Sequence, residues 1–373
     1  MKVLEAAFGL LLVCVVLGEA FETMLLPRRI RRPFRFIALY FRITWGSWAI
    51  VGRRLRPGTI KDGFLSVYGP LSVVLLLAFW VAGLILGFGI FQWAIQSGMP
   101  KSPSLGGAIY VSAASLFTAD SVDIHPLTRL AKSTAVFEGG AGLAFMTVTI
   151  GYLPVLYQLF SRREALIIQL DARAGSPPTA AALLCRHTQT QAMDQLGQLL
   201  REWEQWCAEL IESHLSYPML SYYRSQHDNQ SWLAALAALM DTSALLLAGF
   251  KGVRTFSARM TFSMGRLALE EICRAFHENP ATSPPDRLSQ ADFITLERSL
   301  AQGGLVFSNS DGNPREKLNA LRSTYEPVLF ALSDHFLLPL PGWLPDESPD
   351  NSDQDPGGSR ASELVDSAPA QPE

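Results

Sequence analysis

Two long, mostly apolar stretches of the chain, 65–94 and 135–159, enclose a shorter stretch, 107–126, in which apolar and polar residues mix. A bilayer core about 30 Å thick requires about 20 apolar residues per spanning helix, so each long stretch predicts one spanning helix. The stretch between them is too short and too polar to span, but it is apolar enough to enter the membrane as a half-helix. Irregular backbone is tolerated at that depth only where protein buries it or water lines it. The pattern therefore predicts two spanning helices with a re-entrant segment between them.

Another apolar stretch, 3–26, precedes the basic segment 27–33, Pro-Arg-Arg-Ile-Arg-Arg-Pro. Arg and Lys accumulate on the cytoplasmic side of spanning helices, so we expect a spanning helix over 1–26 with Met1 outside. A cleaved signal peptide, with its apolar part at 10–16, is the alternative. The spanning helix is favoured because Glu5 stands where a signal peptide carries positive charge.

Residues 34–51 are rich in Phe, Tyr and Trp but also contain Arg35 and Arg42. A spanning helix here would place Arg42 near the bilayer centre, at a cost of about 2.5–3.5 kcal/mol on insertion scales. Basic residues at both ends with aromatic residues between them are typical of a helix in the headgroup layer. We therefore expect a basic, interfacial amphipathic helix within 27–62.

The remaining charges orient the helix–loop–helix unit over 63–160. With 27–62 inside, the helix over 65–94 runs outward, and its Gly83-Leu-Ile-Leu-Gly87 spacing lets helix backbones approach closely. The helix over 135–159 returns and ends at Ser161-Arg-Arg-Glu164, which is again basic. The fold class predicted is an all-α membrane protein with three transmembrane helices and an outer re-entrant loop.

From residue 161 onward the chain alternates apolar and polar residues at helical spacing, which predicts a cytoplasmic helical domain over 161–343. Residues 232–250 are nearly all apolar, but Asp241 lies at their centre and no basic cluster precedes them. We favour a buried core helix there over a fourth span. Residues 344–373 are rich in Ser, Pro, Gly and acidic residues, and we expect a disordered tail.

The stretch 110–126 and its flanking helices resemble the pore domain of bacterial potassium channels with one pore loop per chain. In that family the loop typically reads Thr-Val-Gly-Tyr-Gly-Asp, and the longer chain also resembles prokaryotic potassium-channel-like proteins with an extra amino-terminal helix and a long cytoplasmic region. The resemblance implies a cation-channel subunit with potassium as the permeant ion. It also implies a homotetramer, because one loop supplies only a quarter of a ring. The matching filter residues here are Thr118, Ala119, Asp120, Ser121, Val122 and Asp123.

This loop departs from the family pattern at two positions, where Asp120 and Val122 replace glycines. A potassium filter presents rings of backbone carbonyls to the ion, and glycine permits the backbone angles this requires. A β-branched Val is a genuine outlier at such angles. In a four-fold assembly Asp120 would instead present a ring of carboxylates, which is another route to cation selectivity. The alternative is that the loop no longer conducts and keeps only a packing role.

The returning helix carries a candidate gate or hinge, formed by Gly139, Gly140 and Gly142 together with Pro154, at which we expect a kink. The competing interpretation is an adaptation to helix packing. Glu138 is an intramembrane carboxylate and hence a functional candidate, although we favour a buried hydrogen-bond acceptor behind the loop.

The first spanning helix carries a pair of intramembrane carboxylates. Glu19 and Glu22 lie one turn apart, so they share a face of that helix. We favour an anchoring role with the arginines that follow, over a proton relay.

Composition narrows the function class. Hydrophobic residues make up 49% of the 373 residues and the mean hydropathy is +0.17, which fits a membrane protein with a large soluble part. The net charge is −3, and the four cysteines have no paired spacing. No phosphate-binding glycine loop, nucleophile elbow or metal motif occurs, so we expect no enzyme, no cofactor and no nucleic-acid partner. A multi-pass protein of the cell membrane with a cytoplasmic carboxyl-terminal region is expected, and a non-conducting scaffold or signalling protein is the second hypothesis.

Overall fold

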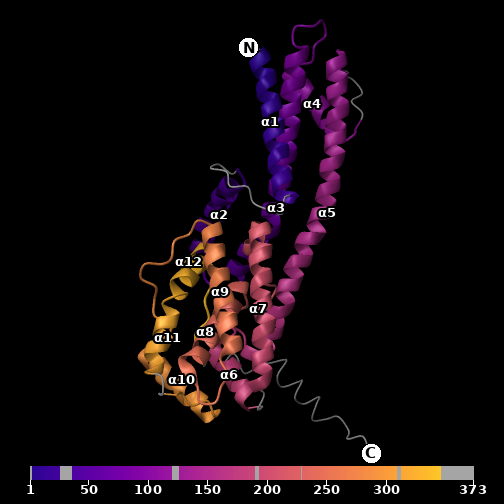
Figure 1. Cartoon of the computed structure of the whole chain (residues 1–373). Coiled ribbons are helices and arrows are strands. Elements are labelled where there is room, and N and C mark those ends of the chain that lie inside the picture. The colour runs from indigo at the N-terminus through magenta and orange to yellow at the C-terminus, as the bar shows by residue number, and fades with distance from the viewer. Residues whose placement is uncertain are drawn as a thin grey trace, which may run out of the picture. The chain divides into compact units, whose positions relative to one another are not determined.

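The computed structural model describes residues 2–25, 36–119, 126–189, 193–227, 229–308 and 312–345, and these contain helices joined by loops but no β-strand (Figure 1). The chain divides into two compact units, Met1–Leu159 and Phe160–Glu373. Four helices are long and apolar enough to cross a membrane. The all-α class is therefore as predicted, and the number of spans depends on which of the four helices lie in the bilayer. The helices of the first unit are α1 (Lys2–Met24), α2 (Phe36–Arg54), α3 (Thr59–Gln96), α4 (Leu105–Leu116) and α5 (Arg129–Ala174), the last of which continues into the second unit.

Helices α1 and α3 pack antiparallel along a seam of small residues. A Cβ added to Gly83 would lie 2.9 Å from Val16 Cγ2, and one added to Gly87 would lie 2.8 Å from Val13 Cγ2. On α1, a Cβ at Gly9 would lie 2.6 Å from the carbonyl oxygen of Gly87. Small residues that admit close backbone contact are the usual device of helix packing in lipid. The Gly83–Gly87 spacing marks this seam.

Helix α2 packs along the first half of α3. The rings of Phe36 and Phe79 stack with centroids 4.9 Å apart, and those of Trp48 and Phe64 stack at 4.4 Å. The pairing runs in opposite directions along the two helices, so α2 and α3 are antiparallel neighbours. Arg42 is exposed. Placement of α2 in the headgroup layer stays a prediction, but its aromatic residues serve helix packing as well.

The second unit is a bundle built around one apolar helix. Its core helix is α8 (Trp232–Gly249), and 89% of the most apolar part of that helix is buried. Helices α7 and α9 both contact α8 and present charged residues outward. The other elements are α6 (Ala180–Gln189), α7 (Met193–Ser216), the 3₁₀ helix η1 (Pro218–Tyr222), α9 (Phe256–Ala275), α10 (Gln290–Gln302), α11 (Pro314–Arg322) and α12 (Glu326–Phe336).

Asp241 in the middle of α8 is fully buried and paired. Its carboxylate accepts hydrogen bonds from Arg287 Nη2 at 2.6 Å and from the Tyr325 hydroxyl at 2.6 Å. Arg287 also lies 3.4 Å from the carboxylate of Glu326. Buried charges are tolerated when they are paired and hydrogen-bonded. This arrangement fits the core helix that the sequence favours at 232–250.

Candidate functional site

The short helix α4 lies between α3 and α5 (Figure 1). Its 12 residues extend about 18 Å, which is less than the thickness of a bilayer core. On one side, a Cβ added to Gly89 of α3 would lie 2.9 Å from the Cα of Ile109. On the other side, a Cβ added to Gly142 of α5 would overlap the carbonyl oxygen of Leu116. Glycines on both long helices therefore admit the backbone of α4.

The carboxyl end of α4 closes in a Schellman motif. The N–H of Ala119 donates to the carbonyl of Ala114 at 2.8 Å, and the N–H of Thr118 donates to that of Ser115 at 3.1 Å. Thr118 adopts the left-handed conformation this turn requires, with φ of 54°. Such an angle is unusual for a β-branched residue. Thr118, the first of the candidate filter residues, thus serves as the cap that turns the chain away from α4.

A buried polar network connects α4 to both long helices. The carboxylate of Glu138 in α5 is fully buried and accepts a hydrogen bond from Gln92 Nε2 of α3 at 3.0 Å. It also bonds to the hydroxyl of Ser112 in α4, and that hydroxyl lies 2.9 Å from the carbonyl oxygen of Ile85. Glu138 therefore occupies the junction of three helices as a buried hydrogen-bond acceptor, the role favoured from sequence.

After α4, the chain returns to the carboxyl end of α3. Gln96 is the last residue of α3, and its side-chain oxygen accepts a hydrogen bond from the backbone N–H of Leu127 at 2.9 Å. Leu127 lies just before α5, so the amino end of α5 stands beside the carboxyl end of α3. The segment from α4 to Leu127 therefore begins and ends beside the carboxyl end of α3.

The candidate gate residues occupy different surroundings. Gly139 and Gly142 face the end of α4, where a Cβ on Gly139 would lie 3.3 Å from the carbonyl oxygen of Ser115. Gly140 is exposed and has open space around it. Pro154 lies inside α5, which continues through it. Packing explains Gly139 and Gly142, while Gly140 and Pro154 stay candidates for a hinge.

Four of the six candidate filter residues, Asp120, Ser121, Val122 and Asp123, lie outside the described residues. Thr118 and Ala119 are described, and both are exposed. The structure therefore positions the start of the candidate filter, and the carboxylate-ring interpretation of Asp120 stays a prediction.

In the carboxylate pair of α1, Glu19 has a hydrogen-bond partner in α2 that the sequence did not predict. Glu19 Oε1 accepts a hydrogen bond from the backbone N–H of Phe36, the first residue of α2, at 3.4 Å. A carboxylate at a helix amino terminus is stabilised by the unpaired N–H groups and the helix dipole. Glu22 is half-buried. The arginines expected to anchor both carboxylates lie outside the described residues.

The second unit holds a further buried cluster around Arg163. Its guanidinium donates to the carbonyl of Leu220 at 2.9 Å, lies 3.0 Å from the carboxylate of Glu164 and contacts His214 Nε2 at 3.3 Å. Burial, and then the nearby charge of Arg163, lower the pKa of His214 well below its usual value. Among the described residues, no group of three or more His, Cys, Asp and Glu side chains is placed to hold a metal ion.

A relative of this chain is also described as a membrane protein. It is the uncharacterized membrane protein YdjJ of Bacillus subtilis strain 168, 25% identical over 182 residues. The match covers 47% of this chain and 52% of that protein, so the chain spans about half the length of the curated relative it matches. No protein-family model matches the chain, and no solved structure matches it. Together with the four apolar helices, this likeness supports an α-helical membrane protein.

Proposed function

We propose that this chain is a subunit of a cation channel, with potassium as the ion favoured by resemblance. The observation that carries the proposal is α4, a helix too short to span a bilayer that packs between two long apolar helices. The bond from Leu127 to Gln96 returns the chain to the level at which it entered. A half-helix followed by a loop is the plan of an ion-channel pore, in which the loop presents carbonyls or carboxylates to the ion.

The direction of α4 favours a cation. The carboxyl end of a helix carries a partial negative charge, because its last carbonyl groups lack partners within the helix. In α4 this end leads directly into Thr118 and the candidate filter. Asp120 and Asp123 would add carboxylates to the same segment. Both features attract cations and repel anions.

A homotetramer is part of the proposal, because one loop lines only part of a pore. Much of α5 is free to contact other subunits or lipid, since only 17% of its most apolar part is buried within one chain. Large apolar side chains on it are exposed, among them Val136 at 77% and Ile150 at 70%. Extended apolar surface of this kind marks a protein–protein or membrane interface.

The proposed topology has three spans, α1, α3 and α5, with the re-entrant loop outside and the second unit in the cytoplasm of a multi-pass cell-membrane protein. The basic residues near the inner ends of these helices support this orientation. Burial of α8 by its own unit and pairing of Asp241 support leaving α8 out of the bilayer. We assign the second unit a regulatory role.

The second candidate is a non-conducting scaffold or signalling protein that uses the channel-like unit to oligomerise. It is favoured by Asp120 and Val122, which stand where a potassium filter has glycine.

Current recordings from the purified protein in a planar bilayer distinguish between the channel and the scaffold. A cation current that Asp120→Asn abolishes, or shifts in selectivity, supports the channel. A silent bilayer with an intact tetramer supports the scaffold. As a matched control, Asp62→Asn removes a carboxylate far from the loop and should leave the current unchanged.

A further inference from the structure

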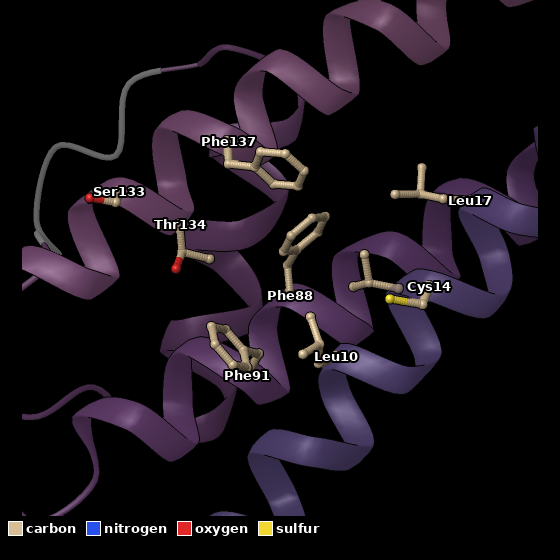
Figure 2. A pocket seen from close by; sticks show the side chains of 9 residues that line it. Leu10, Cys14, Leu17, Phe88, Phe91, Ser133, Thr134 and Phe137 are labelled. Atoms are coloured by element: carbon tan, nitrogen blue, oxygen red, sulfur yellow. The ribbon is translucent and has the colours of Figure 1, made fainter.

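A cavity of about 360 Å³ lies among α1, α3 and α5 in the first unit (Figure 2). The side chains of Phe88 and Phe91 point into it from α3 (Figure 2). Apolar residues form most of the wall, and its polar side chains are two hydroxyls at one end. The other apolar lining residues are Leu10, Val13 and Leu17 of α1 and Phe137 of α5, and the thiol of Cys14 lies between the two leucines.

The polar end of the cavity cannot hold a network of water. Ser133 and Thr134 supply its hydroxyls, and Thr134 Oγ1 already donates to the carbonyl of Leu130 at 2.9 Å. A buried water needs two to four polar partners, and apolar cavities exclude it. Because the walls belong to helices apolar enough to lie in a membrane, hydrocarbon is the occupant that this lining suits.

The length of the groove suits an extended chain. Leu10 and Leu17 lie two turns apart on α1, so the groove extends about 10 Å along that helix. An acyl chain is a thin, extended run of methylene groups, and it can lie along an apolar groove of this length.

Positive charge gathers at the hydroxyl end of the cavity. Arg129 is exposed and precedes Ser133 by one helical turn, so the two share a face of α5. Lys132 is exposed in the same first turn, where the helix dipole adds partial positive charge. Glu5, the carboxylate toward this end of α1, lies about 140° around the helix from Leu10. The charge beside the cavity therefore complements an anionic headgroup.

We propose that this cavity, the α1–α3–α5 groove, binds one acyl chain of an anionic phospholipid, with its phosphate beside Arg129 and Ser133. The proposal rests on these helices lying in the membrane and does not depend on conduction. A chain held there would link α1 to the helices that carry α4.

Lipid retention by the purified full chain tests the proposal. Native mass spectrometry, after exchange into mild detergent and addition of phosphatidylglycerol or phosphatidylcholine, counts bound phospholipid per chain. We expect a retained phosphatidylglycerol on the wild type and on Val15→Trp, a control whose side chain lies outside the groove. Cys14→Trp fills the groove and should lose it. Arg129→Gln should reduce the preference for phosphatidylglycerol about fivefold, the effect of one charge near an anionic headgroup.

A second readout needs no bulky substitution. With Cys185, Cys207 and Cys273 replaced by serine, Cys14 is the one thiol left to react with a maleimide. Bound phosphatidylglycerol should slow this alkylation in the folded protein severalfold, and phosphatidylcholine should slow it less.

Three results would overturn the proposal. The first is equal lipid retention by Cys14→Trp and Val15→Trp, with alkylation of Cys14 unaffected by lipid. The second is an Arg129→Gln protein with unchanged lipid preference. The third is efficient oxidative cross-linking of Cys14 between two copies, which would make the groove a subunit interface.

Discussion

Gly142 of α5 lies directly against the carbonyl oxygen of Leu116, the last residue of α4. No side chain fits between them, because even a Cβ at position 142 would overlap that oxygen. The contact fixes the depth at which α4 ends and therefore the starting point of the segment that follows.

The close contact predicts a sharp difference between two neighbouring glycines. Gly142→Ala should destabilise the protein by about 1–3 kcal/mol, as overpacking does in other cores. Gly140→Ala should not destabilise the protein and should gain up to about 1 kcal/mol from the higher helix propensity of Ala, because nothing lies within 4 Å of its added Cβ. Thermal unfolding of the two variants in detergent, followed by tryptophan fluorescence, measures the difference. Equal stabilities would show that α4 does not pack on α5 in this way.

We predict that Glu138→Gln leaves the stability of the protein nearly unchanged, whereas Glu138→Ala lowers it. Glu138→Ala leaves the Gln92 amide and the Ser112 hydroxyl without their shared acceptor, at a cost of about 1–3 kcal/mol. Glu138→Gln keeps an acceptor oxygen and adds an N–H group, which can bond to Gln92 Oε1, a buried oxygen without a partner in the described network. Its stability should match the wild type within about 0.5 kcal/mol. If Glu138→Gln is as unstable as Glu138→Ala, the carboxylate has a role beyond this junction.

Much of the first unit could be predicted from local patterns. The lengths of apolar stretches predict α1, α3 and α5 and the short helix α4, and the acceptor role of Glu138 follows from a lone carboxylate in an apolar helix. The Gly83–Gly87 spacing is the one local signal for the seam with α1.

Contacts between distant residues could not be predicted in this way. The packing of α2 along α3 depends on cross-helix ring pairs, and no local pattern distinguishes these from an aromatic belt. The left-handed angle of Thr118 runs against the preference of a β-branched residue. Arg287 and Tyr325, the partners of Asp241, lie far along the chain from it, so only the folded unit brings them together.

Replacing Asp241 distinguishes between two interpretations of α8, a buried core helix and a membrane-spanning helix. If α8 faced lipid, Asp241→Leu would stabilise the protein by removing a carboxylate from hydrocarbon. In the buried network it leaves Arg287 without its main partner and should cost about 3–5 kcal/mol. The double variant Asp241→Leu with Arg287→Met should recover most of this loss, since apolar replacements of a whole buried pair are often neutral. Chemical unfolding of the three proteins provides the comparison.

Because His214 is buried, we expect the folded protein to lose stability in mild acid. Its pKa is lowered in the folded state by burial and then by Arg163, so the unfolded chain, with a pKa of about 6.5, binds the proton more readily. The stability contributed by neutral His214 is complete above about pH 6.5 and declines as the pH falls, by at most about 1.4 kcal/mol per pH unit.

The His214→Gln variant isolates this effect, because it removes the titrating ring but retains a polar side chain. Unfolding midpoints measured from pH 8 to pH 5 should fall more steeply for the wild type than for the variant. Parallel curves would mean that His214 is not buried in its neutral form.

Site-directed labelling tests the proposed re-entrant path most directly. In a background with all four native cysteines replaced by serine, Lys101→Cys lies before α4 and Leu127→Cys lies just before α5. Ser161→Cys lies within α5, at the proposed inner end of its membrane-spanning part. A membrane-impermeant maleimide applied to intact cells should label positions 101 and 127 and should reach position 161 only after permeabilisation. Labelling of 101 and 127 from opposite sides would mean that the segment crosses the membrane, which contradicts the account.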